Sequence, residues 1–555
     1  GTGGVWDAVG GVAAAGKGIV VGVVDTGIAP EHPSFKGDKL KKKNNKKSDG
    51  QPYSDGSYVY FDKSDGTQFR SAIVGGQDWD KHDYTTKLVG GQYFSTGAAA
   101  AGFDFQYDYL SPRDGDGHGS HTASTAAGNF GVEAQVEDVE FGTVSGVAPA
   151  AKVSAYKACY VGPDPLVTTD DICALSDLIA AIDQAVADGV DVINYSIGGG
   201  APSSVLQPDD ISFFNAAAAG VFVSVSAGNS GPDASTADHA SPWYTTVAAS
   251  TIPTWEGTVS FDGFEQAGAS VSVPFGETVT GPAIYAGDAA AAGAADPRLC
   301  QPGALDPAKA SGHIVVCDRG VNARVEKSQV VKDAGGIGMV LVNVPGEADS
   351  LDNDFHAVPT VHLSSVHREA VLAYVQGGAD RPITLTGENT TDETTPVPQI
   401  AGFSSRGPMQ ADGSDVMKPD VAAPGVAILA ATNNAKKDKP TFGILSGTSM
   451  ASPHVAGLGA LYLGERPTAS PAEVKSALMT TAYDTVNADG SKNTDPFAQG
   501  AGQVDATRFL DPGMLYLNGA ADWAAFLEGK GLAEFDGIEP IDGSDLNLAS
   551  ISIGT

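Results

Sequence analysis

GIVVGVVDTG (residues 18–27) decides the fold class of this 555-residue chain. It is an apolar, β-branched run that ends in small and polar residues. Three later runs share this design: AKVSAY (151–156), GVDVINYSIGG (189–199) and GVFVSVSAGNSG (220–231). Apolar runs without polar alternation are typical of strands that are buried on both faces. We therefore expect these four runs to form one parallel sheet.

A helical pattern lies between two of these runs. SDLIAAIDQAVADG (176–189) has four apolar residues at helical spacing: Leu178, Ile179, Ile182 and Val186. The pattern ends at Gly189, and glycine is the residue that most often ends a helix. Alternating strands and helices predict an α/β fold, a parallel sheet with helices on both faces. Ligands of such sheets bind beyond the carboxyl ends of the strands, where Asp25 and Asn229 lie.

Composition excludes several classes of protein. Apolar residues make up 42% of the chain and charged residues only 18%, which indicates a folded globular protein. The formal net charge of −34 makes nucleic acid an unsuitable partner, because phosphate would be repelled. The acidic surface is explained by solubility and salt tolerance, or by a preference for cationic substrates. No apolar stretch is long enough to cross a membrane.

The four cysteines fall into two near pairs, Cys159 with Cys173 and Cys300 with Cys317. Neither pair has the spacing of zinc ligands, so we expect two disulfides in an oxidising compartment, with free buried thiols as the alternative. No charged and apolar leader precedes Gly1. We therefore expect the mature form of a secreted, extracellular protein.

Composition also changes along the chain. The sequence after residue 255 is rich in alanine, glycine and small polar residues, and a second set of strand and helix patterns follows it. We expect a catalytic domain in two parts, residues 1–255 and 398–515. An inserted domain would cover residues 256–397, and a C-terminal extension residues 516–555. The last residues, SDLNLASISIGT (544–555), alternate as a strand does and are a candidate start of a further β-domain.

Three polar residues form a candidate catalytic set. Ser449 begins a helical pattern, where its hydroxyl would lie near the positive end of the helix dipole. A serine hydroxyl needs a base to take its proton, and an imidazole oriented by a carboxylate is the usual arrangement. His118 and Asp25 are the candidates for these roles. The alternative for Ser449 is an ordinary N-cap serine.

A second histidine leaves a metal site open as an alternative. His121 follows His118 by three residues on a helical pattern, so the two rings could share a face. The chain lacks an HExxH arrangement and has few other histidines, which argues against zinc. We expect His121 to be buried and hydrogen-bonded, and we assign no metal ligand.

Four segments give the chain a family resemblance. VVDTGI, DGHGSHTA, AGNSGP and SGTSMASPHVAG resemble the signature segments of subtilisin-like serine proteases (subtilases, S8 family), in that family's order. The resemblance implies a subtilisin-like fold and a Ser-His-Asp endopeptidase made as a zymogen. Asp25 matches the orienting acid, His118 the base and Ser449 the nucleophile. Asn229 matches the side-chain donor of the oxyanion hole.

The resemblance also implies features outside the triad. HIVVCDRG and AGGIGMVLVN are similar to the protease-associated domain inserted in plant-type subtilases, whose tail leads into a fibronectin-like domain. SIGG resembles the strand that pairs with substrate, so Ser196 and Gly198 are expected to contact the substrate backbone. The family favours a large apolar side chain in its specificity pocket. No cofactor is expected; calcium is a candidate structural ion without assigned ligands.

Two competing functions remain at this point. The chain could be a catalytically silent module that only holds peptides, or a metallohydrolase. The expected partners are polypeptide substrates, with no nucleic acid and no membrane, and a homodimer through the inserted domain is a candidate assembly. An imidazole base predicts activity at neutral to alkaline pH that falls in acid.

Overall fold

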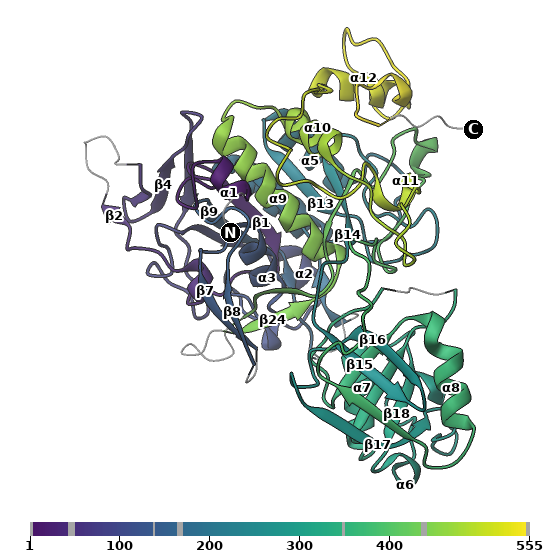
Figure 1. The fold of residues 1–555 in the computed structure, drawn as a ribbon. Helices are drawn as coiled ribbons and strands as arrows, with labels where there is room; N and C mark the ends of the chain where they lie inside the picture. Colours follow the sequence, from purple (N-terminus) through teal and green to yellow (C-terminus); the bar gives the residue numbers. More distant parts are fainter. Residues whose placement is uncertain are drawn as a thin grey trace.

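The computed structural model describes residues 4–42, 50–136, 139–163, 170–346, 350–433 and 441–550, and Figure 1 shows their fold. Within these ranges the central element is a seven-stranded sheet in which every neighbouring pair is parallel. Its strands, in spatial order, are β22 (Val421–Pro424), β14 (Thr245–Ser250), β13 (Phe222–Ser226), β12 (Val192–Tyr195), β1 (Val20–Asp25), β9 (Lys152–Lys157) and β6 (Leu88–Tyr93). The four apolar runs form β1, β9, β12 and β13, so the predicted parallel sheet is confirmed.

Helices cover both faces of this sheet, as predicted. Successive side chains of a strand point to opposite faces, and two neighbouring residues of β12 contact different helices. The Asn194 side chain accepts a hydrogen bond from Ser452 of α9 (Thr448–Glu465), 2.8 Å, while the Tyr195 ring packs edge-on against Phe213 of α5 (Pro208–Ala218), with ring centroids 5.0 Å apart. Helix α3 (His118–Ala127) packs against α9, and α4 (Leu175–Asp188) packs against α5.

Helix α4 follows the predicted span but is rotated slightly from the predicted face. Its buried apolar residues are Leu178, Ala181, Ile182 and Ala185. Ile179 and Val186 are only half-buried. Alanine allows a helix to approach a sheet closely, so the small residues lie at the centre of the contact. Gly189 ends the helix with a φ of 85°, the left-handed conformation that favours glycine.

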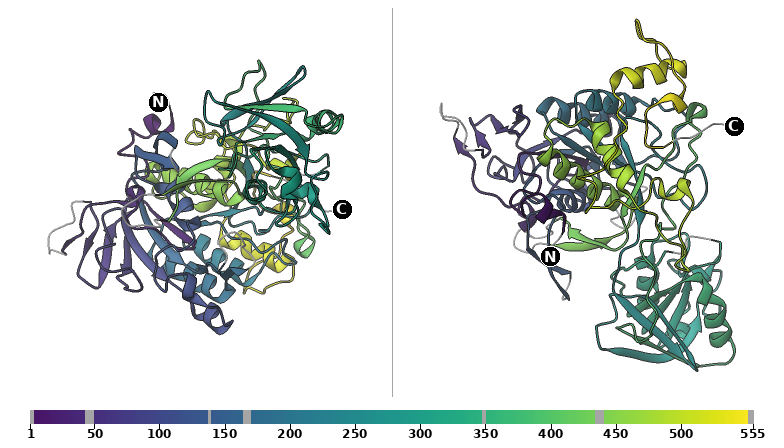
Figure 2. Two further views of the ribbon diagram at one scale, coloured as in Figure 1. Left: turned by 90° about the horizontal axis from the view of Figure 1, so that it is seen from below. Right: turned by 45° about the horizontal axis from the view of Figure 1, so that its top comes forward.

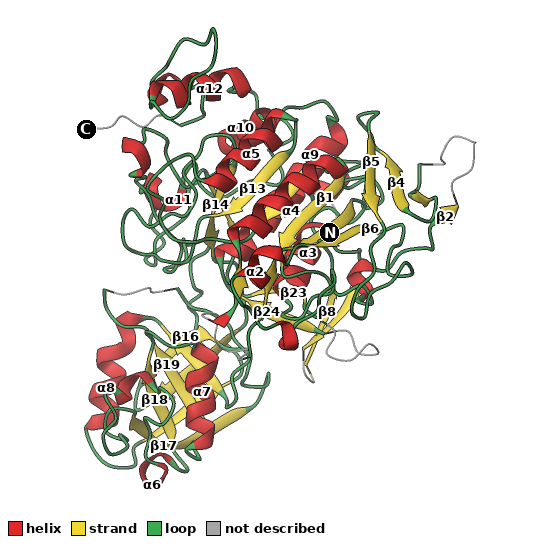
Figure 3. Ribbon diagram, turned by 180° about the vertical axis from the view of Figure 1, so that it is seen from behind, coloured by secondary structure: helices red, strands yellow, loops and turns green. Residues whose placement is uncertain are grey.

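The chain leaves the sheet after β14 and forms a closed barrel before it returns at β22 (Figures 1 and 3). The barrel strands, in spatial order, are β15 (Glu256–Phe261), β16 (Phe264–Ala269), β20 (Thr360–Leu363), β19 (Gly338–Val342), β18 (Ile314–Asp318), β17 (Thr278–Tyr285) and β21 (Pro382–Thr386). Helices α7 (Arg324–Asp333) and α8 (Arg368–Gln376) lie on its outside. Apolar side chains such as Val259, Val340 and Leu385 give it a core of its own. Thr258 of β15 pairs with Thr386 of β21, so the first and last barrel strands are neighbours and the chain enters and leaves the barrel at the same place.

Smaller elements surround the sheet. They are β2 (Lys41–Lys42), β3 (Tyr53–Ser54), β4 (Tyr58–Asp62), β5 (Gln68–Ala72), β7 (Val132–Val136), β8 (Val139–Val144), β10 (Cys159–Tyr160), β11 (Ile172–Cys173), β23 (Ile428–Ala431), β24 (Phe442–Leu445), α1 (Val5–Ala8), α2 (Thr96–Ala100), α10 (Pro471–Thr481), α11 (Pro496–Gln499) and α12 (Ala520–Gly529). Helix α6 (Pro307–Ala310) lies instead at the barrel, between β17 and β18 in the sequence (Figure 1). The run VAAPGVAIL (421–429) is apolar throughout but is not one strand. It divides instead between β22 and β23, because Ala427 has a φ of 55° and turns the chain between the two sheets.

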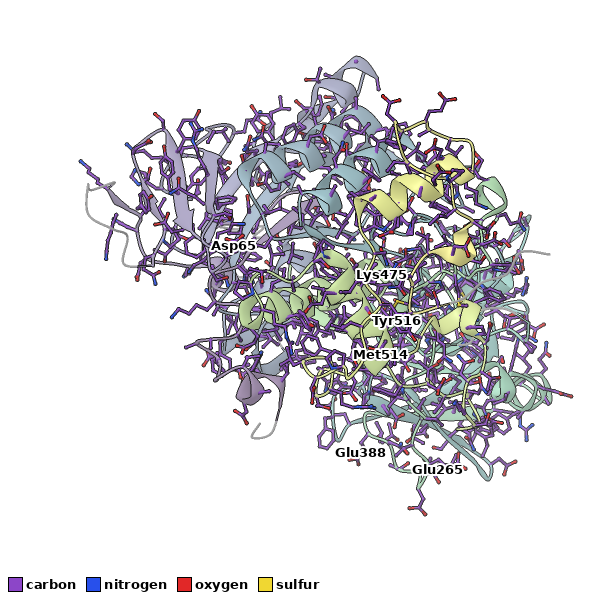
Figure 4. The ribbon with its side chains drawn as sticks, turned by 90° about the horizontal axis from the view of Figure 1, so that it is seen from above. Asp65, Glu265, Glu388, Lys475, Met514 and Tyr516 are labelled. Carbon is purple, nitrogen blue, oxygen red and sulfur yellow. A yellow bond between two sulfur atoms is a disulfide. The ribbon has the colours of Figure 1, made fainter. Side chains whose placement is uncertain are left out.

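The segment after the sheet packs back onto the same body. Figure 4 shows Met514 and Tyr516 beside Lys475 of α10; Tyr516 N donates to Ser476 Oγ, 2.7 Å, and Thr480 Oγ1 to the Met514 carbonyl, 3.2 Å. Helix α12 then lies at the end of the molecule opposite the barrel (Figure 2).

The alternating tail does not form the expected strand in the part that is described. Residues 544–550 are a short 3-10 turn and loop, and residues 551–555 lie outside the described ranges. Leu546 and Leu548 are buried in the main core, so their alternation reflects packing rather than strand pairing. Among the described helices, none is both long and apolar enough to cross a bilayer.

Candidate active site

The sheet topology brings three of the predicted residues to one edge. β1 and β12 are parallel neighbours with Val24 opposite Tyr195, so Asp25 and Ser196 leave the sheet side by side. β13 is the next strand, and Asn229 follows its carboxyl end. This is the edge where parallel sheets bind ligands.

Asp25 and His118 form a hydrogen-bonded pair. The His118 Nδ1 atom lies 2.7 Å from Asp25 Oδ1, and the Asp25 side chain is 2% exposed. Thr26 N also donates to Asp25 Oδ1, and Thr122 Oγ1 donates to Oδ2 at 3.1 Å. Because Asp25 Oδ1 accepts from the ring, it fixes the imidazole tautomer with its proton on Nδ1. The Nε2 atom of His118 is therefore the basic one.

The electrostatic setting of His118 favours its protonated form. Burial acts to lower the pKa of His118, but the Asp25 carboxylate outweighs burial, and Asp116 and Asp114 add to the effect. The pKa of His118 is raised to about 9. An imidazolium formed at this position is thus strongly stabilised, as a base that accepts a proton during a reaction requires.

The start of α3 depends on a residue that the sequence analysis missed. Asp114 Oδ1 accepts hydrogen bonds from Thr26 Oγ1 and from the amides of residues 116 and 117, and Oδ2 accepts from Ser120 N and Oγ. One buried carboxylate thereby ties the end of β1 to the first turn of α3. The Asp114–Gly117 spacing resembles an acidic helix cap, which is the signal that could have revealed it.

Ser449 is the second residue of α9 and faces Ser196. Ser449 Oγ donates to the Ser196 carbonyl, 3.1 Å, and Ser196 Oγ donates to the Ser449 carbonyl, 2.8 Å. Pro453 explains the second bond, because a proline four residues on has no N–H for the Ser449 carbonyl. Pro453 lies inside the helix, in its second turn. Of the hydrogen bonds made by the described residues, none joins Ser449 Oγ to His118.

Asn229 is held by the residue before Ser449. Its Oδ1 atom accepts from Thr448 N and Thr448 Oγ1, both at 2.9 Å. Thr448 Oγ1 in turn accepts from Gly228 N, 3.1 Å. Since the oxygen end of the amide is engaged, its Nδ2 donor points away from α9's first residue. The amide is thus oriented rather than free to rotate.

A cleft of about 910 Å³ runs along this edge. Its lining includes Asp25, His118, Ser196 and Gly198. Ser449 and Asn229 are not among the lining residues; Ser449 reaches the cleft wall through its bonds to Ser196. The structure therefore brings Asp25 and His118 into direct contact. Ser449 bonds Ser196, which lines the same cleft, and Asn229 bonds Thr448, the residue before Ser449.

Both predicted disulfides are present. Cys159 and Cys173 are opposite residues of the β10–β11 ribbon, with Cα atoms 4.2 Å apart, and both line the cleft. Cys300 and Cys317 are joined in the barrel, with Cα atoms 5.9 Å apart. The alternative of free thiols is thus excluded for all four cysteines.

His121 is buried and hydrogen-bonded, as predicted. Its Nε2 lies 2.9 Å from the Ile428 carbonyl, and the residue has no exposed surface. Burial lowers the pKa of His121 to about 3, so the ring is neutral. Within the described ranges no group of three or more His, Cys, Asp and Glu side chains is arranged to hold a metal, so no step is assigned to calcium or zinc.

Comparison with known proteins shows the family of the chain. The sequence profile of the subtilase family (Peptidase S8) matches residues 16–502. The chain is similar to two subtilisin-like proteases of Arabidopsis thaliana, SBT1.3 (39% identity, 92% of this chain and 64% of the relative) and SBT1.6 (36%, 92% and 66%). It thus spans just under two thirds of the length of these curated relatives.

Solved structures were also compared. The psychrophilic subtilisin-like protease Apa1 from the Antarctic psychrotroph Pseudoalteromonas sp. AS-11 aligns over 94% of this chain and 96% of its own, with 16% identity and a TM-score of 0.39. Fervidolysin from Fervidobacterium pennivorans covers 91% of this chain and 43% of its own, with 18% identity and a TM-score of 0.38. On the profile match and the curated relatives, this chain belongs to the subtilase family.

Proposed function

We propose that the chain is a serine endopeptidase with Ser449 as nucleophile, His118 as general base and Asp25 as the residue that orients His118. The observation that carries the proposal is the 2.7 Å bond from Asp25 to His118 Nδ1, on the cleft wall that Ser196 shares with Ser449. This bond leaves Nε2 of His118 as a base directed at the cleft. A structural histidine would need no such partner.

In the first step the Ser449 hydroxyl leaves the Ser196 carbonyl and attacks the carbonyl carbon of a bound peptide. His118 Nε2 takes the hydroxyl proton, and the negative charge moves to the carbonyl oxygen of the substrate. Asn229 Nδ2 and the Ser449 backbone N–H donate to this oxyanion, and the α9 dipole adds to its stabilisation. The Asp25 carboxylate stabilises the imidazolium.

In the second step His118 returns its proton to the leaving amine, the C–N bond breaks and the acyl group stays on Ser449. Water then enters, His118 takes one of its protons, and the hydroxide adds to the ester carbonyl. Collapse of this intermediate releases the carboxylic acid and returns the proton to Ser449. The cycle needs no cofactor.

Covalent labelling tests the nucleophile directly. An organophosphorus reagent should label the chain once, at Ser449, and Ser449→Ala should abolish labelling and casein hydrolysis while its circular dichroism spectrum and thermal unfolding stay unchanged. Unchanged labelling of Ser449→Ala would refute the assignment. Active-site titration alongside casein turnover separates the endopeptidase from a silent peptide-binding module, and activity that a strong chelator removes would favour a metallohydrolase.

Substrate contacts and domain roles are part of the same proposal. Ser196 and Gly198 would offer backbone groups to an extended peptide, since their segment lies in the cleft wall. The barrel within 256–397 would be a protease-associated domain inserted between the catalytic parts 1–255 and 398–515. Residues 516–555 would be an extension that leads toward a fibronectin-like domain. We also propose the inserted domain as the homodimer contact.

Secretion and zymogen maturation complete the proposal. Two disulfides support an oxidising, extracellular location, because such bonds rarely persist in the cytosol. Polypeptides are the proposed substrates. Calcium remains a candidate structural ion only, since the described side chains offer no ligand cluster.

A further inference from the structure

The Asp238 side chain is built into the cleft between two glycines. Asp238 N donates to the Ala227 carbonyl, 2.9 Å, which fixes the residue next to the end of β13. Its carboxylate then lies between Gly198 and Gly228, and a Cβ atom at either glycine would overlap a carboxylate oxygen. Only glycine at both positions leaves room for this group. The cleft lining includes Asp238 together with Gly198.

This carboxylate is incompletely paired. Asp238 Oδ1 has less than 1 Å² of exposed surface and no hydrogen-bond partner in the described part of the chain. Other carboxylates of the cleft have partners: Asp25 bonds His118, Asp210 accepts from Tyr244, and Asp171 accepts from the Gly162 amide. A buried oxygen without a donor is costly, so a ligand that supplies a donor is favoured here.

Apart from His118, the charged side chains that line the described cleft are acidic. Its acidic residues are Asp25, Asp116, Asp171, Asp209, Asp210 and Asp238, and its described lining contains neither lysine nor arginine. Burial raises the pKa of Asp238 to about 6, opposed by a hydrogen bond from the Gly200 amide. The carboxylate is therefore ionised at the neutral to alkaline pH at which the imidazole base works. A cationic side chain would therefore meet a surplus of negative charge there.

The position of Asp238 relates it to the reacting centre. Gly198 follows Ser196, whose carbonyl and hydroxyl both bond Ser449. Gly228 precedes Asn229 and donates to Thr448 Oγ1. The space between these two segments is thus adjacent to both the nucleophile and the oxyanion donor. A peptide bound with the attacked carbonyl at Ser449 would have the side chain of that residue next to this space.

We propose that Asp238 is a specificity-determining residue, which selects lysine or arginine as the substrate residue whose carbonyl Ser449 attacks. The inference rests on the proposed endopeptidase function and replaces the family-based expectation of a large apolar side chain. The ammonium or guanidinium group would donate to the unpartnered Asp238 oxygen. A neutral side chain of the same length would leave that oxygen unpaired, and a site of this kind rejects analogues that lack the donor.

Matched fluorogenic peptides test the proposal. They differ only at the residue before the cleaved bond, which is lysine, norleucine or glutamate, and kcat/KM is measured for each at one pH. We expect the chain to prefer lysine over norleucine by at least tenfold and to reject glutamate. Asp238→Asn keeps the shape and removes the charge, so the lysine-to-norleucine ratio should fall to about one. Asp238→Ser should do the same if the asparagine variant folds poorly.

A control variant separates this local charge from the general acidity of the protein. Asp183→Asn changes an exposed carboxylate of α4 that does not line the cleft, and the ratio should stay unchanged. A wild-type ratio of one or less, or an equal ratio in Asp238→Asn, would overturn the proposal.

Phosphonate reagents distinguish failure of the two proposals. Diphenyl phosphonates carrying a lysine-like or a norleucine-like side chain should label Ser449, the cationic reagent faster. Faster labelling by the norleucine reagent would overturn the role of Asp238 and leave the serine mechanism standing. Absence of labelling by both reagents and by the organophosphorus probe would overturn the endopeptidase function and this inference with it.

Discussion

Asn229 and Thr448 are joined by two hydrogen bonds, both to Asn229 Oδ1 and both 2.9 Å long. The residue that precedes the proposed nucleophile therefore orients the proposed oxyanion donor. Because Thr448 is also the first residue of α9, the helix dipole, the nucleophile and the amide share one rigid attachment. The site is pre-organised before a substrate arrives, which is what transition-state stabilisation by fixed dipoles requires.

Loss of the Asn229 amide should lower kcat rather than raise KM. The oxyanion exists only in the transition state and intermediates, so its donor does not contribute to ground-state binding. Asn229→Ala is expected to reduce kcat by about 10²–10³-fold, the magnitude known for this donor in subtilisin itself. Steady-state kinetics on one peptide substrate provides the measurement. A large rise in KM with kcat unchanged would contradict the role.

The rise of activity with pH should fall in an unusually alkaline range. The base must be neutral to accept the Ser449 proton, and the pKa of His118 is raised to about 9 by Asp25, against the effect of burial. We expect kcat/KM to rise with pH and to level off only above about pH 9. Asp116→Asn removes one carboxylate that favours the imidazolium, so it should move this limb to lower pH. A profile centred near the ordinary histidine pKa would contradict the electrostatic assignment.

The same ion pair should contribute to stability in a defined pH window. The native pKa of His118 lies above the unfolded value of 6.5, so the native state binds the proton more tightly. The contribution is complete below about pH 6.5 and is lost as pH rises through about 9. Thermal unfolding of wild type and His118→Gln between pH 6 and 10 measures it. The difference between the two proteins should shrink as pH rises.

One substitution in a buried charge cluster, which does not line the cleft, should cause a large loss of stability. Asp420 is 2% exposed and pairs with Lys418 at 2.7 Å and Lys475 at 2.8 Å. Asp420→Asn removes the carboxylate shared by two buried amino groups, of which Lys418 has its pKa lowered to about 7 by burial, and should cost about 3–5 kcal/mol of unfolding free energy. Asp484→Asn is the matched control, because its 2.7 Å pair with Lys492 is exposed and should be worth about 1 kcal/mol or less. Denaturant unfolding compares them.

The two disulfides should have separable effects. Replacing Cys159 and Cys173 by serine removes a cross-link of separation 14, worth about 3 kcal/mol in the chain-entropy model, and loosens a cleft wall. We expect lower thermal stability and a higher KM. Replacing Cys300 and Cys317 should lower stability with KM unchanged, since that bond lies in the barrel. Equal effects on KM would show that the cleft wall does not depend on the first bond.

Those features of the fold that depend on the local sequence pattern could be predicted. Uniformly apolar runs gave the parallel strands, and the polar residues that end them, Asp25 and Asn229, follow strands at the predicted edge. The rotation of α4 was missed because apolar spacing does not distinguish a buried alanine from a half-buried isoleucine. Likewise, Leu546 and Leu548 alternate as strand residues do, yet tertiary packing buries them in a loop.

Contacts between distant segments could not be predicted. The Thr26–Asp114 hydrogen bond and the position of Asp238 between Gly198 and Gly228 arise only when loops from different strands meet. The Ser196–Ser449 bonds combine a strand end with the missing donor of Pro453, two features that lie far apart in the sequence. A motif identifies each residue, but the fold decides its partners.

The antiparallel pairing of Thr258 with Thr386 has an architectural consequence. It closes the barrel where the chain enters and leaves it, so the two ends of the inserted segment lie side by side. The sheet strands on either side of the insertion, β14 and β22, pair directly, with Val247 opposite Val421. A module attached in this way can be gained, exchanged or trimmed as a cassette. The host sheet would keep its register throughout, and with it the spacing of the proposed catalytic residues.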